Sequence, residues 1–168
     1  MDTSDSNIVF DENGVCDHCN DFYKNVKPNW HTDEKGKSQL EKIVAKIKQD
    51  GKGKDFDCIL GLSGGVDSSY MLHLAVKEFG TKPLVFHVDG GWNCELAVHN
   101  IQMLVEKLNL DLYTEVINWE EMRDFQLAFF KSGLPHIDLP QDHAFVATLY
   151  NFAYKYNIKY ILNGGNIS

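Results

Sequence analysis

The stretch Leu62-Ser63-Gly64-Gly65-Val66-Asp67-Ser68-Ser69 follows a short apolar run, residues 56–61, and decides the fold. Adjacent glycines let the backbone turn tightly and approach a ligand without Cβ clashes. The hydroxyls of Ser63, Ser68 and Ser69 can donate hydrogen bonds to anionic oxygens. A helix that begins after the glycines directs free N–H groups and the positive end of its dipole at the same point. The stretch therefore predicts a phosphate or pyrophosphate site between a strand and a helix.

Asp67 is out of place in a simple anion site, because a carboxylate repels phosphates. Its presence makes sense if it helps to hold a Mg²⁺ ion that bridges them. The alternative is a glycine turn in which Asp67 caps the helix.

Short apolar runs alternate with longer amphipathic ones along the rest of the chain. This alternation predicts an α/β fold with a doubly wound parallel sheet. Ligands of such sheets bind at the carboxyl ends of the strands, near the point where strand order reverses. The expected strands are 56–61, 84–88, 112–117 and 160–162, and the expected helices are 66–79, 94–108, 120–131 and 143–156.

The segment SGGVDSS, residues 63–69, resembles the pyrophosphate loop (PP-loop) of the ATP pyrophosphatase superfamily, whose fold is that of the adenine-nucleotide alpha hydrolases. The resemblance implies ATP as cofactor, with Mg²⁺, and cleavage between the α and β phosphates. A substrate oxygen is adenylated, pyrophosphate leaves, and a nucleophile then displaces AMP. Such catalysis is largely electrostatic, since N–H donors and Mg²⁺ stabilise the departing pyrophosphate.

Two further stretches resemble the superfamily's other nucleotide-binding segments. Val88, Asp89 and Gly90 end the second expected strand and match the stretch that meets adenine and ribose. Gly164-Gly165-Asn166 follows the fourth expected strand and matches a glycine turn beside the nucleotide. Both could also be ordinary turns after strands. With the loop they complete the expected nucleotide-binding set: Ser63, Gly64, Gly65, Val66, Asp67, Ser68, Ser69, Val88, Asp89, Gly90, Gly164, Gly165 and Asn166.

The stretches FDENGVCDHC (10–19) and IDLPQDHA (137–144) resemble the N-acetyl sugar amidotransferase family of bacterial surface-polysaccharide (lipopolysaccharide) biosynthesis. The resemblance covers nearly the whole chain. It implies that ATP adenylates the acetamido oxygen of an N-acetyl sugar and that ammonia then attacks the activated carbon. A glutaminase subunit and a cyclase-like ammonia-channel subunit are the implied partners. The family extends beyond both ends of this sequence, so we expect a truncated chain.

Asp138, Asp142 and His143 are expected in a loop before a helix, where they would lie over the nucleotide. Carboxylates and an imidazole suit the orientation of a sugar or the removal of protons from attacking ammonia, so Asp142 and His143 join Asp67 as candidate catalytic residues. Asp142 could equally cap the helix, and His143 could be a surface residue.

Residues 1–37 are polar and predict a small irregular segment and linker that contains cysteines, whereas 38–168 predict the nucleotide-binding α/β domain. The first long helix is expected to start at Ser38, because Ser38 and Glu41 have the spacing of a capping box.

Cys16 and Cys19 form a CxxC pair, which is half of a four-thiolate zinc site. The resemblance implies another CxxC upstream, which this chain lacks. Three interpretations stay open: a vestigial half-site, a Zn²⁺ site completed by later residues or a second chain, and plain loop cysteines. Cys58 and Cys94 are expected to be buried thiols.

The 168-residue chain has 16 Lys+Arg against 24 Asp+Glu, a net charge of −8. This balance argues against broad binding to nucleic acid or to an anionic membrane. No apolar run is long enough to span a bilayer, and the first residues lack the pattern of a secretory signal. We expect a cytoplasmic protein, with the oligomeric state, a homo-oligomer included, left open.

Two alternatives to a sugar amidotransferase remain. One is another PP-loop enzyme, such as a tRNA-thiolating or queuosine-type ligase, which Cys94 favours and the negative charge disfavours. The other is a non-catalytic, truncated nucleotide-binding module.

Overall fold

The computed structural model describes residues 2–165. Within them lies a parallel sheet of strands β1 (Cys58–Gly61), β2 (Pro83–Asp89), β3 (Leu112–Val116) and β4 (Ile161–Leu162). The strand order is β3-β2-β1-β4, and every pairing is parallel. Because β4 returns to the other side of β1, the strand order reverses at β1. The predicted α/β fold with a doubly wound parallel sheet is confirmed.

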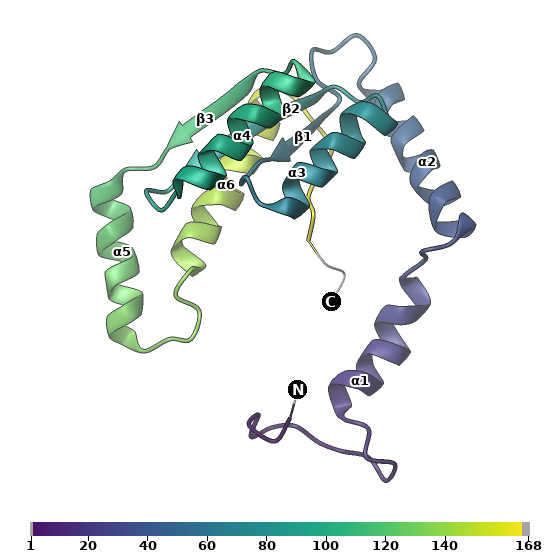
Figure 1. Cartoon of the computed structure of the whole chain (residues 1–168), viewed down its shortest axis with the longest axis vertical. Coiled ribbons are helices and arrows are strands. Elements are labelled where there is room, and N and C mark those ends of the chain that lie inside the picture. Colours follow the sequence, from purple (N-terminus) through teal and green to yellow (C-terminus); the bar gives the residue numbers. More distant parts are fainter. Residues whose placement is uncertain (1, 166–168) are drawn as a thin grey trace. The chain divides into compact units, whose positions relative to one another are not determined.

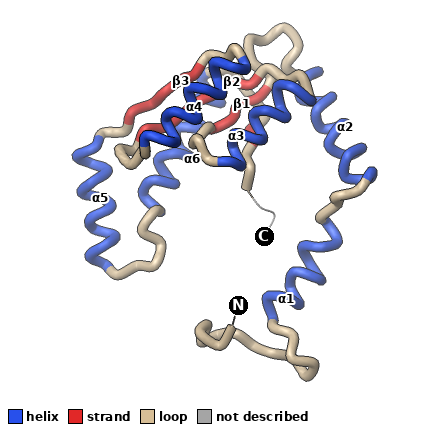
Figure 2. Tube along the Cα trace, viewed as in Figure 1, coloured by secondary structure: helices blue, strands red, loops and turns tan. Residues whose placement is uncertain are grey.

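Helices cover both faces of this sheet (Figures 1 and 2). Helices α3 (Val66–His73) and α4 (Glu95–Leu108) pack on one face around Leu60 and Val85. Helix α6 (Leu139–Lys155) packs on the other face around Ile59 and Leu84. Adjacent residues of a strand therefore enter different cores, as the two-residue period of a strand requires. Both faces are apolar, which explains why these strands read as continuous apolar runs.

Helix α5 (Trp119–Ser132) follows β3 and packs against α6 in a helical hairpin (Figure 1). The Asn118 side chain caps its start by accepting hydrogen bonds from the N–H groups of Glu120 and Glu121, at 3.0 and 3.3 Å. Gly133 ends it in the left-handed conformation, with φ of +69°. These are the residue types that helix ends favour.

The observed helix starts differ from two predictions. Helix α2 runs over Glu34–Asp50, so Ser38 lies inside the helix. The prediction that Ser38 and Glu41 form a capping box at its start is therefore wrong. The carboxylate of Asp33 instead accepts a hydrogen bond from the Gly36 N–H at 3.2 Å, as an N-cap does. Helix α6 begins at Leu139 rather than at residue 143, and Pro140 lies in its first turn, where proline is favoured.

The chain forms two compact units, one reaching to Ile43 and one spanning Val44–Gly164. The first holds the short helix α1 (Asp17–Asp21), the π-helical turn η1 (Phe22–Val26), the 3₁₀ turn η2 (Lys27–Asn29) and the start of α2. The second holds the sheet, in which α3 continues as the π-helical turn η3 (Leu74–Glu78). None of the helices in the described part of the chain is long and apolar enough to cross a membrane.

Candidate functional site

The loop between β1 and α3 takes its shape from Gly64. This residue is buried, has φ of +78°, and lies so close to α4 that an added Cβ would be 2.4 Å from the carbonyl oxygen of Ala97. Gly65 differs, since its φ of −78° and ψ of 165° suit any residue. An added Cβ at Gly65 would meet only the Ser63 hydroxyl, at 3.4 Å. Only one of the two glycines is therefore required by the fold, and the other keeps the surface of the loop open.

Hydrogen bonds hold the serines of the loop together. The Ser63 and Ser68 hydroxyl oxygens lie 3.1 Å apart, and the Ser68 hydroxyl donates to the Gly65 carbonyl at 3.3 Å. Asn100 on α4 donates from its side chain to the Gly64 carbonyl at 3.1 Å. No described side chain caps the N-terminus of α3. The end of this helix therefore retains the N–H groups that an anion would accept as hydrogen-bond donors.

A cavity of about 370 Å³ lies where the carboxyl ends of three strands meet. Ser63 after β1, Val88 in β2 and Gly164 after β4 all line it. Its volume falls within the usual range of small-molecule sites, about 300–1,000 Å³. Each of the three predicted nucleotide-binding stretches thus contributes a residue to one cavity, hereafter the nucleotide cavity. Apolar side chains from α6, Phe145 and Leu149 among them, form much of the remaining wall.

Asp67 lies in the first turn of α3 and is exposed. Gly164 packs against it, since an added Cβ on Gly164 would be 3.3 Å from the Asp67 Cβ. The N-cap of α3 is Gly65, and no described group donates a hydrogen bond to the Asp67 carboxylate. The capping alternative for Asp67 therefore finds no support. A carboxylate free beside the phosphate loop fits a Mg²⁺ ion shared with phosphate oxygens.

The second predicted stretch is divided between two cavities. Val88 is buried and faces the nucleotide cavity, whereas Asp89 lines a neighbouring cavity of about 300 Å³. The Asp89 carboxylate accepts a hydrogen bond from the Gly91 N–H at 2.9 Å and so shapes the turn after β2. Gly90 is buried in this turn, close to Gln141 on α6.

His87 is a residue that the sequence analysis missed. Its side chain lines both of these cavities and joins two loops. The ring Nδ1 lies 2.9 Å from the Leu62 carbonyl oxygen, and Nε2 lies 3.0 Å from the side-chain nitrogen of Asn93. The Leu62 carbonyl can only accept and the Asn93 side-chain nitrogen can only donate, so the tautomer with its proton on Nδ1 satisfies both contacts. His87 therefore ties the start of the loop after β1 to the loop after β2.

The expectation for Asp142 and His143 needs correction. Both lie within the first two turns of α6 rather than in a loop, because this helix starts at Leu139. Asp142 and Asp138 line a separate cavity of about 530 Å³. His143 is exposed and lines neither this cavity nor the nucleotide cavity. The structure thus separates His143 from the carboxylates with which it was grouped.

The third predicted stretch, Gly164-Gly165-Asn166, lies at the end of the described residues, which include its two glycines. Gly164 lines the nucleotide cavity. Gly165 is exposed and belongs to the other compact unit, and Asn166 lies outside the described residues. Of the remaining loop residues, Val66 is 79% exposed, and Ser69 is half-buried in the first turn of α3. The roles of these residues remain predictions.

The CxxC pair lies after a tight turn built on Asp11, whose carboxylate accepts hydrogen bonds from the N–H groups of Asn13 and Val15, each at 2.9 Å. Cys16 is buried and Cys19 is exposed. Hydrogen bonds, chiefly from the Cys19 N–H, lower the pKa of the Cys16 thiol. Within residues 2–165, no group of three or more His, Cys, Asp or Glu side chains is placed to hold a metal ion. The pair therefore supplies two ligands, and Zn²⁺ remains a prediction.

The other two cysteines differ from each other. Cys58 is fully buried in β1, as predicted, and burial raises the pKa of its thiol to about 12. Cys94 was expected to be buried but is exposed, because it forms the N-cap of α4 rather than part of the helix face that packs on the sheet. It lines the nucleotide cavity.

A glycine-serine loop lies between the first parallel strand and a helix N-terminus, at the point where strand order reverses, which is the arrangement of the PP-loop ATP pyrophosphatase fold. The model of the phosphoadenosine phosphosulfate reductase domain matches residues 57–134. The GMP synthase [glutamine-hydrolyzing] of Burkholderia vietnamiensis is 31% identical over 100 residues, which are 60% of this chain and 17% of that protein. These matches support the PP-loop ATP pyrophosphatase superfamily.

Solved structures confirm the fold. NMN synthetase from Francisella tularensis aligns with a TM-score of 0.56 and 22% identity, over 77% of this chain and 54% of that one. Glutamine-dependent NAD⁺ synthetase from Acinetobacter baumannii, solved with ADP, aligns with a TM-score of 0.57 and 20% identity, over 73% of this chain and 24% of that one. NH₃-dependent NAD synthetase from Campylobacter jejuni aligns with a TM-score of 0.53 and 19% identity, over 75% of this chain and 55% of that one. The chain thus spans about half the length of the shorter of these proteins.

Proposed function

We propose that this chain binds ATP in the nucleotide cavity and uses it to adenylate the acetamido oxygen of an N-acetyl sugar. The observation that carries the proposal is the single cavity lined by Ser63, Val88 and Gly164, at the carboxyl ends of three parallel strands. The loop N–H groups and the N-terminus of α3 bind the β and γ phosphates and stabilise the pyrophosphate as it leaves. A Mg²⁺ ion, when bound beside Asp67, adds positive charge at the phosphates.

The reaction balances as two displacements. The acetamido oxygen attacks the α phosphorus, the bond from that phosphorus to the bridging oxygen breaks, and pyrophosphate leaves. Ammonia then attacks the activated carbon, the carbon–oxygen bond to AMP breaks, and loss of protons leaves an acetamidino group. A glutaminase subunit with a cyclase-like channel partner supplies the ammonia, and the product enters lipopolysaccharide or a related glycan. The names of the related proteins, among them a glutamine-hydrolysing and an NH₃-dependent enzyme, agree with ammonia as the nucleophile.

ATP binding is tested with a matched pair of serine variants. Ser63→Ala removes a hydroxyl that lines the nucleotide cavity and should weaken ATP binding by about 1–3 kcal/mol, the scale of a charge-assisted hydrogen bond. Ser132→Ala at the end of α5 removes a hydroxyl that bonds only the Phe129 carbonyl and should leave ATP affinity unchanged. Isothermal titration with Mg·ATP measures both. Equal affinities in the two variants would contradict the assignment of the loop.

A second variant tests whether the loop surface must stay open. Gly65→Ala leaves the backbone unstrained, because φ of −78° suits alanine, so the protein should fold normally. The added methyl group would lie 3.4 Å from the Ser63 hydroxyl, at the proposed phosphate position, and should weaken ATP binding. The chemistry itself is tested by product release from ATP in a single turnover: pyrophosphate release should require an N-acetyl sugar, and AMP release should require both the sugar and ammonia.

Cys94 favours a second candidate function, sulfur transfer by another PP-loop enzyme. Its thiol is exposed and lines the nucleotide cavity, where an activated substrate would form. Cys94→Ser distinguishes the two functions, because amidation by ammonia needs no thiol. Retention of AMP production in the presence of ammonia would favour the amidotransferase, and its loss would favour thiol chemistry.

A further inference from the structure

The cavity of about 530 Å³ lies in the hairpin of α5 and α6, beside the nucleotide cavity. Trp92, from the turn after β2, and Gln141, from α6, line both cavities. The two cavities therefore adjoin at these side chains. A molecule bound in the hairpin cavity would have one end next to the nucleotide.

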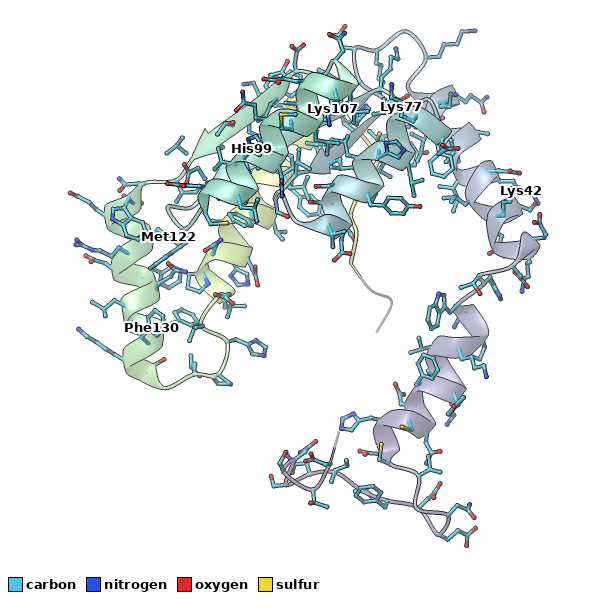
Figure 3. The ribbon with its side chains drawn as sticks, in the orientation of Figure 1. Lys42, Lys77, His99, Lys107, Met122 and Phe130 are labelled. Atoms are coloured by element: carbon cyan, nitrogen blue, oxygen red, sulfur yellow. The ribbon has the colours of Figure 1, made fainter. Side chains whose placement is uncertain are left out.

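One face of α5 forms a wall of this cavity. Met122, Gln126 and Phe130 are spaced four residues apart and so lie on the same face of the helix. Met122 is 4% exposed and Gln126 5% exposed, whereas Phe130 is half open to solvent and lines the cavity. Figure 3 labels Met122 and Phe130 near opposite ends of α5, with Gln126 midway between them in sequence. On this face of α5 a buried amide lies between two apolar side chains, and Gln126 and Phe130 line the cavity.

Trp92 decides which way this amide points. The Trp92 indole N–H donates a hydrogen bond to Oε1 of Gln126. Because an indole nitrogen can only donate, Gln126 must present its oxygen to Trp92 and its NH₂ group elsewhere. No described residue accepts a hydrogen bond from that NH₂ group, and no fully buried polar atom there is left without a partner, so the NH₂ group keeps some exposed surface. Because Gln126 lines the cavity, the NH₂ group is available to a molecule bound there.

Apart from Gln141 at the junction, whose amide can both donate and accept, the remaining polar side chains of the cavity are acceptors. Asp138 and Asp142 contribute carboxylates, and the described lining residues include no Lys, Arg or His. Hydroxyl groups donate well to carboxylates, a carbonyl oxygen accepts from an amide NH₂, and the aromatic rings of Trp92 and Phe130 supply apolar contact surface. A carboxylate or phosphate placed between two aspartates would be repelled.

We infer that the hairpin cavity is the acceptor site, and that it takes an uncharged, hydroxyl-rich group with a carbonyl oxygen. Gln126 donates to that oxygen, oriented by Trp92, and Asp138 and Asp142 accept from the hydroxyls. The inference rests on the proposed function, because it assumes that an acceptor must meet ATP at the junction of the two cavities.

The test measures binding of two probes while a non-cleavable ATP analogue, with a methylene group between the α and β phosphorus atoms, fills the nucleotide cavity. N-acetylglucosamine should bind, and N-acetylglucosamine 6-phosphate should bind at least tenfold more weakly. Gln126→Glu keeps the acceptor for Trp92 but replaces the NH₂ donor with a charge. It should weaken N-acetylglucosamine binding by roughly tenfold, since an oxygen loses its donor, without changing the affinity for the analogue.

Gln49→Glu on the exposed side of α2 is the matched control, and it should alter neither affinity. If Gln126→Glu fails to fold, as judged by its melting temperature, Phe130→Ala takes its place, because a half-exposed ring can be removed with little loss of stability. Asp138→Asn removes one of the two negative charges and should reduce the difference in affinity between N-acetylglucosamine and its 6-phosphate.

Equal binding of the two probes, or unchanged binding of N-acetylglucosamine in both cavity variants, would overturn the inference. The inference would also be overturned if the ATP analogue bound but neither sugar did, and the assignment of the nucleotide cavity would then still stand. Failure of the analogue itself to bind would instead overturn the proposed function, and this inference with it.

Discussion

Gly64→Ala is expected to be the most damaging single substitution in the loop, and its cost can be worked out in two parts. Alanine in the left-handed conformation at φ of +78° costs about 1–2 kcal/mol. The new Cβ would also lie 2.4 Å from the Ala97 carbonyl oxygen and 2.8 Å from its Cα, both backbone atoms of α4. Forcing the loop and the helix apart adds about 1–3 kcal/mol. The total is about 2–5 kcal/mol, a large fraction of the roughly 5–15 kcal/mol that holds a domain folded.

Gly53→Ala is the matched control for this substitution. Gly53 has nearly the same φ, +81°, but an added Cβ would have no neighbour within 4 Å. The Gly53→Ala variant should therefore lose only the stability that the left-handed conformation costs an alanine, about 1–2 kcal/mol. Urea unfolding of the two variants and of the unmodified protein measures both losses, and the difference between the variants isolates the contact with α4.

ATP affinity completes the assay. Gly64→Ala should weaken ATP binding under conditions in which the protein remains folded, because the loop must move to relieve the contact, whereas Gly53→Ala should not. If both variants lose the same stability and bind ATP like the unmodified protein, Gly64 does not shape a phosphate site and the reasoning is refuted.

Three further predictions concern charge and reactivity. The Tyr160 hydroxyl donates to Asp50 at 2.7 Å and is the main cause of the lowered pKa of that carboxyl. This contribution to stability is present above the unfolded-state pKa, about 3.9, and is lost as pH falls through the lower folded-state value. In the Tyr160→Phe variant, the free energy of unfolding measured with urea should therefore fall less steeply as the pH drops below about 4 than it does in the unmodified protein. Identical pH profiles for the two proteins would contradict this. At pH 8, Cys58 should resist iodoacetamide in the folded protein while Cys94 reacts, because burial raises the pKa of Cys58 to about 12; mass spectrometry of labelled peptides distinguishes the two sites. Asp67→Asn should remove most Mg²⁺-dependent release of AMP from ATP while the melting temperature stays nearly unchanged, since Asp67 is exposed and its carboxylate accepts no hydrogen bond from a described residue; full turnover in this variant would exclude a role in catalysis.

Boundaries of elements were harder to predict than their order. The start of α6 was placed four residues late, because Asp142 and His143 read as polar loop residues. The sequence did carry a signal for the earlier start, since Asp138 lies at the N-cap position and Pro140 in the first turn. The error at Ser38 has a similar origin, because the capping box matched by spacing alone while Asp33 makes the hydrogen bond.

The loop over residues 62–69 and the order of strands and helices could be predicted from the sequence because both depend on local patterns. A glycine pair between an apolar strand and a helix sets the backbone within a few residues, and hydrophobic periodicity distinguishes strand from helix in short windows. The tertiary structure alone brought Trp92 to Gln126 and packed Gly64 on Ala97, residues more than thirty positions apart. Such contacts depend on how each crossover packs its helix on the sheet, which no local pattern encodes. For that reason the position of the loop between strand and helix could be predicted from the sequence, whereas the second cavity and its buried amide could not.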